Sequence, residues 1–267
     1  MYDDEEQKAS TTTGEFEGAS KKSNSNVFLA RILQYLETPQ YLRKFLFPRH
    51  PDLQYAGLLN PLDCPHHARL GEDLPFREGV ISDRPARQGR GSYCNVGLQR
   101  EVQVDKLLET NVRVTVRMQA DKGNPGKFTN YGRVVSPSAP KEEVGLYWGF
   151  RVRMAKSLAD VFSEGPYQGG YDRTMGISEQ GQKISEISEI APKFGPFTHL
   201  LLVFGGLHGL EASVEADEKL EVGGSEAATL FDHYVNPLPS PGSRSVRAEE
   251  MVLIACAGLR SLWESQN

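Results

Sequence analysis

Cysteine is scarce in this sequence, and long apolar runs are absent from it. Cys64, Cys94 and Cys256 lie far apart and form no Cys-x-x-Cys pair, which argues against a disulfide framework and favours a reducing compartment. No apolar run approaches the roughly 18–20 residues of a membrane helix, so we expect no membrane partner. The acidic residues 3–6 fit neither a signal peptide nor an Arg-rich transit peptide.

Histidine is rare too, and only one cluster invites a metal interpretation. His66 and His67 follow Asp63 and Cys64 closely in the chain. Adjacent histidines seldom ligate the same ion, and no second cluster of His and Cys completes a site. We therefore expect no bound metal.

Positive charge is unevenly distributed along the chain. The net charge is −5, but residues 76–135 contain eight Arg and three Lys against six Asp and Glu, a net of +5 that leaves −10 for the remainder. Such asymmetry indicates a nucleic-acid partner, although a solvated basic face gives the same count. We predict RNA contacts from these arginines: Arg84, Arg87, Arg90, Arg113, Arg117 and Arg133.

Short segments with distinct periodicities make up the first half of the chain. Residues 1–25 are polar and are predicted to be disordered. Apolar positions at helical spacing predict a helix from residue 27 that Pro39 ends, and a second helix over residues 41–47. Five short alternating segments then predict a small OB-like β-barrel, a fold that commonly binds oligonucleotides. These segments are residues 79–82, 92–96, 101–104, 112–118 and 131–135.

The predicted strand at residues 112–118 alternates valine with Arg113, Thr115 and Arg117. Because successive side chains of a strand point to opposite faces, we expect the valines inside the barrel and the arginines outside.

From residue 145 onward the pattern is that of an α/β domain. We predict strands over residues 146–153, 171–177, 200–204 and 231–235, and helices over residues 157–162 and 246–263. The uninterrupted apolar run of residues 200–204 is typical of a strand in a parallel sheet. The last helix is apolar around most of its circumference, so we expect the sheet and a second subunit to cover it.

Three of these strands end in loops rich in glycine or small polar residues, at residues 174–178, 205–211 and 236–247. Ligands of parallel sheets bind just beyond the carboxyl ends of strands, and glycine lets backbone groups approach a ligand without interference from a Cβ. A Gly-Gly pair after a strand is more often a tight turn. Three such loops together nevertheless predict a site for a nucleoside-type ligand.

These segments resemble those of the SPOUT, or trefoil-knot, methyltransferases. The similarity is closest to their eukaryotic and archaeal RNA methyltransferase branch, which includes a human member associated with kinetochores and the spindle. It extends over roughly residues 14–259. The segments that carry it are LLNPLDCPHH (58–67), FREG (76–79), DRP (83–85), GLYWG (145–149), GYD (170–172), LVFGGLHGLE (202–211), YVN (234–236) and GSRSVRAEE (242–250).

The resemblance implies an α/β fold in which a knotted SPOUT domain, residues 26–75 and 136–267, contains the OB-like RNA-binding barrel of residues 76–135 as an insertion. Members of the family begin with a strand and a helix before the acidic segment found here at residues 3–6. We therefore expect the first strand of the family fold to be missing. The family also implies a homodimer that packs through the C-terminal knot helix.

In the family, the three loops form the knot and hold S-adenosyl-L-methionine (SAM) in a bent conformation. Much of this binding is by backbone groups. Carried over by position, the resemblance implies SAM contacts from Thr174, Gly176, Ser178, Gly205, Gly206, Asn236, Gly242, Ser243, Arg244 and Val246.

The implied function is SAM-dependent methylation of a base, for example uridine N3, in a structured RNA such as rRNA. Because that nitrogen must lose a proton, we hypothesise that Arg244 or Arg247 stabilises the resulting anion and that Glu211 is a candidate base. Simpler explanations exist: surface charge near a helix start for the two arginines, and an acid at a helix N-terminus for Glu211. For Glu211 the simpler explanation is favoured.

Two other functions stay open at this point: a catalytically inactive RNA-binding scaffold of the same fold, and a spindle or kinetochore interaction protein. A Rossmann-type methyltransferase would need an acidic-Gly-x-Gly-x-Gly loop, and the nearest match, residues 89–91, lies among arginines of the expected barrel. We expect the protein in the nucleus, nucleolus or cytoplasm, and at the spindle or kinetochore if it associates with them.

Overall fold

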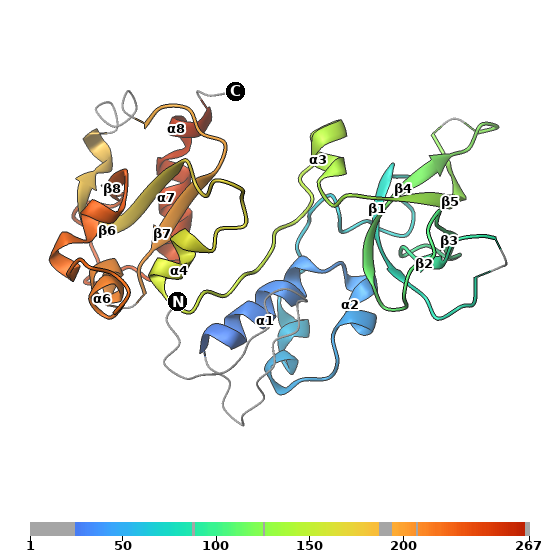
Figure 1. Ribbon diagram of the computed structural model, residues 1–267, viewed down its shortest axis with the longest axis horizontal. Coiled ribbons are helices and arrows are strands. Elements are labelled where there is room, and N and C mark those ends of the chain that lie inside the picture. Colours follow the sequence, from blue (N-terminus) through green and yellow to red (C-terminus); the bar gives the residue numbers. More distant parts are fainter. Residues whose placement is uncertain (1–24, 87–88, 125, 187–193, 207, 265–267) are drawn as a thin grey trace. The chain divides into compact units, whose positions relative to one another are not determined.

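The computed structural model describes residues 25–264, except for residues 87–88, 125, 187–193 and 207. These described residues divide into two compact units, one up to residue 154 and one from residue 155 (Figure 1). None of their helices is long and apolar enough to cross a membrane. The expectations for residues 1–24, including the missing first strand, lie outside the described part. The expected discontinuous SPOUT domain stays a prediction.

The first unit contains two helices followed by a closed barrel. Helix α1 (Ser25–Glu37) and helix α2 (Gln40–Leu46) are separated at Pro39, where a proline ring prevents one continuous helix. Two short 3₁₀ turns follow, η1 (Pro51–Leu53) and η2 (Ala56–Leu58).

The barrel has the strand order β1-β2-β3-β5-β4, and its pairs are antiparallel except for β3 with β5. The strands are β1 (Phe76–Ile81), β2 (Tyr93–Asn95), β3 (Val102–Gln103), β4 (Arg113–Ala120) and β5 (Phe128–Val135), and helix α3 (Ala139–Val144) follows. The prediction of a small five-stranded barrel is confirmed. Val114, Val116 and Met118 of β4 lie in its core together with Cys94 and Val102. The expected inward position is confirmed for Val114 and Val116 and is wrong for Val112, which precedes β4 and is 40% exposed.

The strand predicted over residues 146–153 is wrong, because that segment has no strand partner and runs as an extended strap. Gly145, just before the segment, and Gly149, within it, adopt the left-handed region at φ 68° and φ 86°. A Cβ on Gly149 would lie 2.4 Å from a carboxylate oxygen of Glu37. Trp148, which lies between the two glycines in the sequence, donates its indole hydrogen to Glu78 on β1 at 2.6 Å. The side chains of the barrel, and not a sheet, therefore hold this apolar segment.

The second unit is a three-stranded parallel sheet with helices on both faces. Its strands, in the order β7-β6-β8, are β6 (Arg173–Lys183), β7 (Leu200–Phe204) and β8 (His233–Asn236). The remaining elements are α4 (Leu158–Ser163), η3 (Ile184–Glu186), α6 (Gly209–Glu215), η4 (Gly224–Leu230), α7 (Ala248–Gly258) and α8 (Arg260–Glu264). The predicted strands at residues 171–177, 200–204 and 231–235 and the parallel sheet are confirmed.

Successive side chains of β6 point to opposite faces of the sheet, and helices cover both faces. Met175 and Ile177 pack with Ala255 and Leu259 on the side of α7 and α8. On the opposite face a second cluster joins α4, α6 and η4 to the sheet, with Leu158, Leu210, Val214, Ala227, Phe231 and Tyr234.

The single helix predicted over residues 246–263 is two helices, which part at Leu259. Gly258 ends the first of them, where a Cβ would lie 2.5 Å from Ile184 Cδ1. Glycine is a poor helix former, and at this position it also allows the close approach of Ile184.

Candidate active site

The carboxyl ends of the three parallel strands bring several predicted residues to one edge of the sheet. Ile177 of β6 is in register with Phe204 of β7 and with Val235 of β8. The residues that follow are Ser178, Gly205 and Asn236, so they lie side by side where the pairing of β6 with β7 ends, although β6 itself continues to Lys183. Ligands of open parallel sheets bind at this edge.

A carboxylate with two hydroxyl donors forms the polar centre of this edge. Glu211, in the first turn of α6, accepts a hydrogen bond from the Ser178 hydroxyl and another from the Tyr234 hydroxyl at 2.7 Å, both on Oε1. Burial raises the pKa of Glu211, but these two hydrogen bonds outweigh it and hold the pKa below its ordinary value. Burial and the nearby carboxylate raise the pKa of Tyr234. The cluster is therefore an anion with two neutral donors.

Asn236 connects the end of β8, through a hydrogen bond, to the residue that follows Ser178. Its amide nitrogen donates to the Glu179 carbonyl at 2.7 Å, and its amide oxygen accepts from the Leu238 backbone at 3.0 Å. Beyond this point the parallel register of β6 against β8 shifts, so that Lys183 pairs with Asn236. Asn236 is 8% exposed, so these contacts give it a structural role, and its cofactor contact stays a prediction.

The glycines at this edge fall into two kinds. A Cβ on Gly176 would lie 2.7 Å from the Tyr234 ring, and one on Gly205 would lie 2.3 Å from the Leu210 backbone nitrogen. Packing within the chain alone requires glycine at these two positions. By contrast, among the described residues beyond the chain neighbours, none lies within 4 Å of a Cβ on Gly206 or Gly242. Gly206 is therefore where a ligand has room to approach the backbone at the end of β7.

Thr174 lies at the opposite end of the strands. It is the second residue of β6 and exchanges hydrogen bonds with Asp232, which accepts from the Thr174 backbone nitrogen at 2.8 Å and from its hydroxyl at 3.0 Å. This placement separates Thr174 from Ser178 and Gly205, and it gives no support to a cofactor contact there. The sequence reasoning did not single out Asp232 or Tyr234.

The loop that leads into α7 carries the remaining predicted residues. Gly242, Ser243 and Arg244 are exposed, and Val246 is half-buried. Arg247 lies just before α7 with its side chain 80% exposed and 3.9 Å from Glu249. Its backbone nitrogen donates to Glu250 at 3.0 Å, which starts the helix. Both arginines are thus available to an anionic group outside the chain.

The predicted RNA-binding arginines of the barrel have different surroundings. Arg90 is exposed, Arg84 pairs with Glu101 at 3.4 Å, and Arg133 lies 3.6 Å from Asp105. Arg117 forms an ion pair with Glu143 and lies over the Phe76 ring. Arg87 lies outside the described residues.

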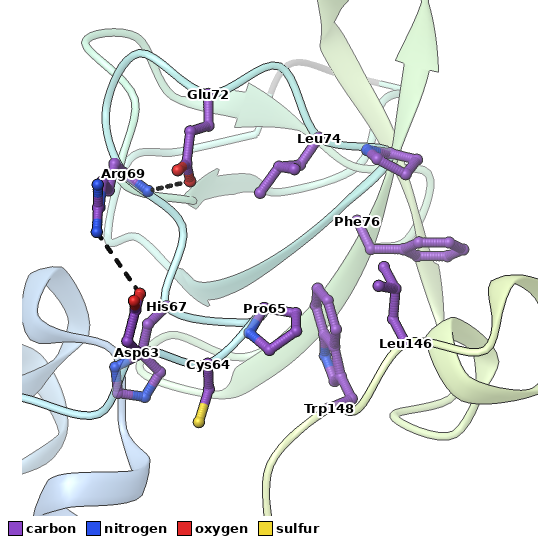
Figure 2. Close-up of a pocket in the computed structure, with 11 residues that line it drawn as sticks. Asp63, Cys64, Pro65, His67, Arg69, Glu72, Leu74, Phe76, Leu146 and Trp148 are labelled. Carbon is purple, nitrogen blue, oxygen red and sulfur yellow. Dashed lines mark hydrogen bonds and ion pairs between the residues drawn. The ribbon is translucent and has the colours of Figure 1, made fainter.

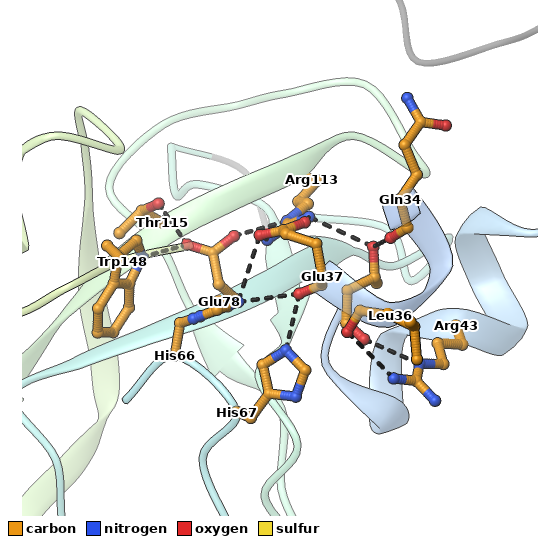
Figure 3. A network of polar contacts seen from close by, with 11 residues as sticks. Gln34, Leu36, Glu37, Arg43, His66, His67, Glu78, Arg113, Thr115 and Trp148 are labelled. Carbon is orange, nitrogen blue, oxygen red and sulfur yellow. Dashed lines mark hydrogen bonds and ion pairs between the residues drawn. The ribbon is translucent and has the colours of Figure 1, made fainter. Parts of the chain in front are cut away.

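Arg113 differs from the other arginines because it belongs to an internal network of charges (Figure 3). Its guanidinium contacts Glu37 at 2.7 Å and Glu78 at 2.7 Å. Its neighbour Thr115 is 2% exposed and donates to Glu78 at 2.5 Å. This part of the outer barrel wall is therefore covered by α1 and the Trp148 strap, and the geometry favours a structural role for Arg113 over an RNA contact.

The histidine cluster is tied to the same network. His66 is fully buried, and its Nε2 lies 2.9 Å from the Glu37 carbonyl oxygen, while His67 Nε2 lies 2.7 Å from that oxygen. Cys64 and His67 line a pocket of about 290 Å³ beside Trp148 (Figure 2). Within the described part of the chain, no three His, Cys, Asp or Glu side chains are grouped as metal ligands.

Comparison with known proteins connects both units to one family. A family model described as "Putative RNA methyltransferase" matches residues 1–259. The chain is 52% identical to the human protein named 28S rRNA (uridine-N(3))-methyltransferase, over 97% of this chain and 67% of the human one. Proteins of the same name from mouse and Drosophila melanogaster are 50% and 49% identical, over 97% and 95% of this chain and 66% and 50% of their own lengths. The chain thus spans about half to two thirds of these relatives.

Proposed function

The chain belongs to this family of RNA methyltransferases, and from that premise we propose that it transfers a methyl group from SAM to N3 of a uridine in large-subunit rRNA. The observation that carries the proposal is the match to relatives named for that reaction across nearly the whole of this chain. The convergence of Ser178, Gly205 and Asn236 at one sheet edge supports it, because parallel sheets hold their ligands there.

The residues of this edge fit a nucleoside-type cofactor. Gly206 leaves its backbone accessible, and the Glu211 anion holds Ser178 and Tyr234 in fixed positions at the strand ends. When bound, SAM supplies an electrophilic methyl group. We propose contacts from Ser178, Gly205, Gly206 and Asn236, and from the loop residues Gly242, Ser243, Arg244 and Val246.

The same geometry changes the role proposed for Glu211. An effective general base has a pKa close to the working pH. The hydrogen bonds that Glu211 Oε1 accepts from Ser178 and Tyr234 hold the pKa of Glu211 below its ordinary value. We therefore propose that Glu211 positions Tyr234 and Ser178, and that the exposed Arg244 or Arg247 stabilises the uridine anion that forms when N3 loses its proton.

The apolar surface of α7 supports a homodimer. Leu253 is 73% exposed and Val252 is 38% exposed, one turn away from the exposed Cys256. Exposed apolar side chains grouped on one helix face mark interaction sites. We propose that α7 packs against a second copy of the chain and that the three loops form the family's knot. An rRNA substrate fits a protein of the nucleus, nucleolus or cytoplasm; association with the spindle or kinetochore stays a prediction.

Two measurements test the proposed activity. Purified chain, radiolabelled SAM and rRNA that lacks the modification should yield 3-methyluridine on nucleoside analysis. Cells without the protein should lose one 3-methyluridine from the large-subunit rRNA. If no methylated nucleoside of any RNA class changes in those cells, the proposal is rejected.

A further inference from the structure

The outer wall of the barrel carries a row of three side chains across three neighbouring strands. Tyr93 of β2 is in register with Gln103 of β3, and Gln103 is in register with Tyr131 of β5. Residues in register share a face of the sheet. Since the alternate residues Cys94 and Val102 lie in the barrel core, the row Tyr93, Gln103 and Tyr131 faces outward.

A cavity of about 510 Å³ lies over this row. Its other lining residues are Arg84, Arg90, Gln99, Arg100, Glu101 and Asn130. The lining includes three arginines and one glutamate, and that glutamate forms an ion pair with Arg84 at 3.4 Å. The cavity therefore keeps an excess of positive charge, which attracts phosphate groups.

The two tyrosines have different surroundings. The Arg84 guanidinium lies 4.0 Å above the Tyr93 ring, which is 9% exposed, so this ring already has a partner. Tyr131 is 47% exposed and offers its ring to a ligand. Between them, the Gln103 side-chain amide is anchored by a hydrogen bond to the Gly91 carbonyl at 3.3 Å.

We propose that this cavity binds one nucleotide of a single-stranded RNA segment, with the base stacked on Tyr131 and the neighbouring phosphates beside Arg90 and Arg100. Aromatic rings next to a basic groove are the common means by which barrels of this kind hold single strands. The side-chain amides of Gln99 and Asn130 are then within the cavity to meet the base edge. A duplex fits poorly, because its base faces are stacked on one another. That the ligand is RNA rests on the proposed function.

Fluorescence anisotropy with the whole chain and a labelled oligouridylate of roughly eight nucleotides tests the stacking. We expect Tyr131→Ala to raise the Kd about ten-fold, because base stacking on an aromatic ring contributes roughly that factor. Tyr131→Phe should stay within about two-fold of the unchanged chain, since the ring is kept. Tyr55→Ala is the matched control, because Tyr55 is 68% exposed in the same unit and does not line the cavity. Equal Kd values for Tyr131→Ala and Tyr55→Ala would overturn the proposal.

The salt dependence of the same binding tests the phosphate contacts. Replacing Arg90 and Arg100 by Gln should reduce the slope of log Kd against log salt concentration by about 0.7 for each arginine. An unchanged slope would contradict phosphate contacts at these positions. A self-complementary RNA duplex should bind more weakly than the single strand, and tighter binding of the duplex would also contradict the proposal.

Calorimetry with SAM and the methylation assay separate this inference from the proposed function. If methyl transfer occurs and Tyr131→Ala binds oligouridylate normally, the cavity proposal fails while the activity stands. If oligouridylate binding depends on Tyr131 and no methylation is found with any RNA, the activity fails while the cavity proposal stands.

Discussion

The Arg113 guanidinium holds the Glu37 carboxylate at two points, at 2.7 Å and 3.0 Å, although 76 residues separate them. Its third nitrogen donates to Glu78 at 2.7 Å, and Glu78 also accepts the indole hydrogen of Trp148 at 2.6 Å. One arginine thus connects α1, β1 and β4, and through Glu78 it reaches the strap after α3 (Figure 3). Two-point ion pairs of this kind have strong and directional hydrogen bonds.

Removing Arg113 should therefore destabilise the first unit. Arg113→Ala leaves two largely buried carboxylates without their cation, and breaking a buried pair in this way costs about 3 kcal/mol. Urea unfolding followed by tryptophan fluorescence measures the change. Arg133→Ala is the control, because that side chain is 72% exposed and should change the free energy of unfolding by less than about 0.5 kcal/mol. Equal effects of the two substitutions would show that the network adds no stability.

The same network should make stability depend on pH in the acid range. Burial raises the pKa of Glu37, but hydrogen bonds with His66 and Arg113 outweigh it and lower the pKa from 4.5 to about 2. The depressed folded-state pKa means that this stabilisation is complete above pH 4.5 and is lost as the pH falls toward 2, a loss of about 3 kcal/mol. Unfolding free energies measured between pH 6 and pH 2 test this. In Glu37→Gln the loss over that interval should be smaller by a comparable amount, and an identical pH dependence would contradict it.

Local patterns in the sequence predict the barrel strands and the parallel sheet, because alternation and apolar runs depend only on near neighbours. Such local patterns do not predict the conformation of the strap at residues 146–153. Its apolar pattern is typical of a strand, yet Gly149 adopts φ 86° and Trp148 is held by a carboxylate that lies 70 residues away in sequence. The outward position of Arg113 was predictable, but its partner Glu37 was not, because no local pattern records a contact across 76 residues.

The candidate site shows the same limit. The glycines and polar residues at the strand ends are visible in the sequence, and parallel topology brings Ser178, Gly205 and Asn236 together. The family resemblance implies a SAM contact from Thr174 as well as from Ser178, but Thr174 lies near the start of the pairing between β6 and β7, and Ser178 lies just beyond its end. Tyr234 was missed because its position in a strand indicates packing, while its hydroxyl reaches the Glu211 carboxylate.

If Glu211 positions its neighbours, substitutions at Glu211 and Tyr234 should not be additive. Tyr234→Phe removes one hydrogen bond, at a cost of about 1 kcal/mol. In the double variant, Glu211→Gln should then weaken SAM binding by less than it does in the otherwise unchanged chain. The coupling between the two substitutions should be about 0.5–3 kcal/mol in the free energy of SAM binding. The acidic limb of the kcat pH profile should stay in place in Glu211→Gln. Its disappearance, with a loss of rate of about 10²-fold or more, would identify Glu211 as the base instead.

The exposed face of α7 predicts a concentration-dependent dimer. Leu253→Glu puts a charge on the side chain with 73% exposure, so it should leave the monomer fold intact and weaken association. Sedimentation velocity of the unchanged chain should show a dimer that this variant lacks. Leu58→Glu is the control, since Leu58 is 82% exposed in the other unit. A monomer in the unchanged chain, or a dimer that survives Leu253→Glu, rejects α7 as the interface.

Adjacent glycines at the end of β7 offer a direct test of where the cofactor lies. Gly206→Ala adds a methyl group with no neighbour within 4 Å in the part of the chain that the structure describes, so the melting temperature should be unchanged. If SAM approaches the backbone here, the same methyl group should raise the Kd for SAM about ten-fold or more in calorimetry.

Gly205→Ala is the matched comparison. Its added methyl group would lie 2.3 Å from the Leu210 nitrogen and 2.4 Å from the Gly209 carbonyl carbon, and relieving such overpacking costs about 1–3 kcal/mol. This variant should therefore lose stability together with SAM affinity, whereas Gly206→Ala should lose affinity alone. If Gly206→Ala binds SAM as tightly as the unchanged chain, the cofactor does not contact the backbone at the end of β7, and the site must be sought along the loops that follow β6 and β8.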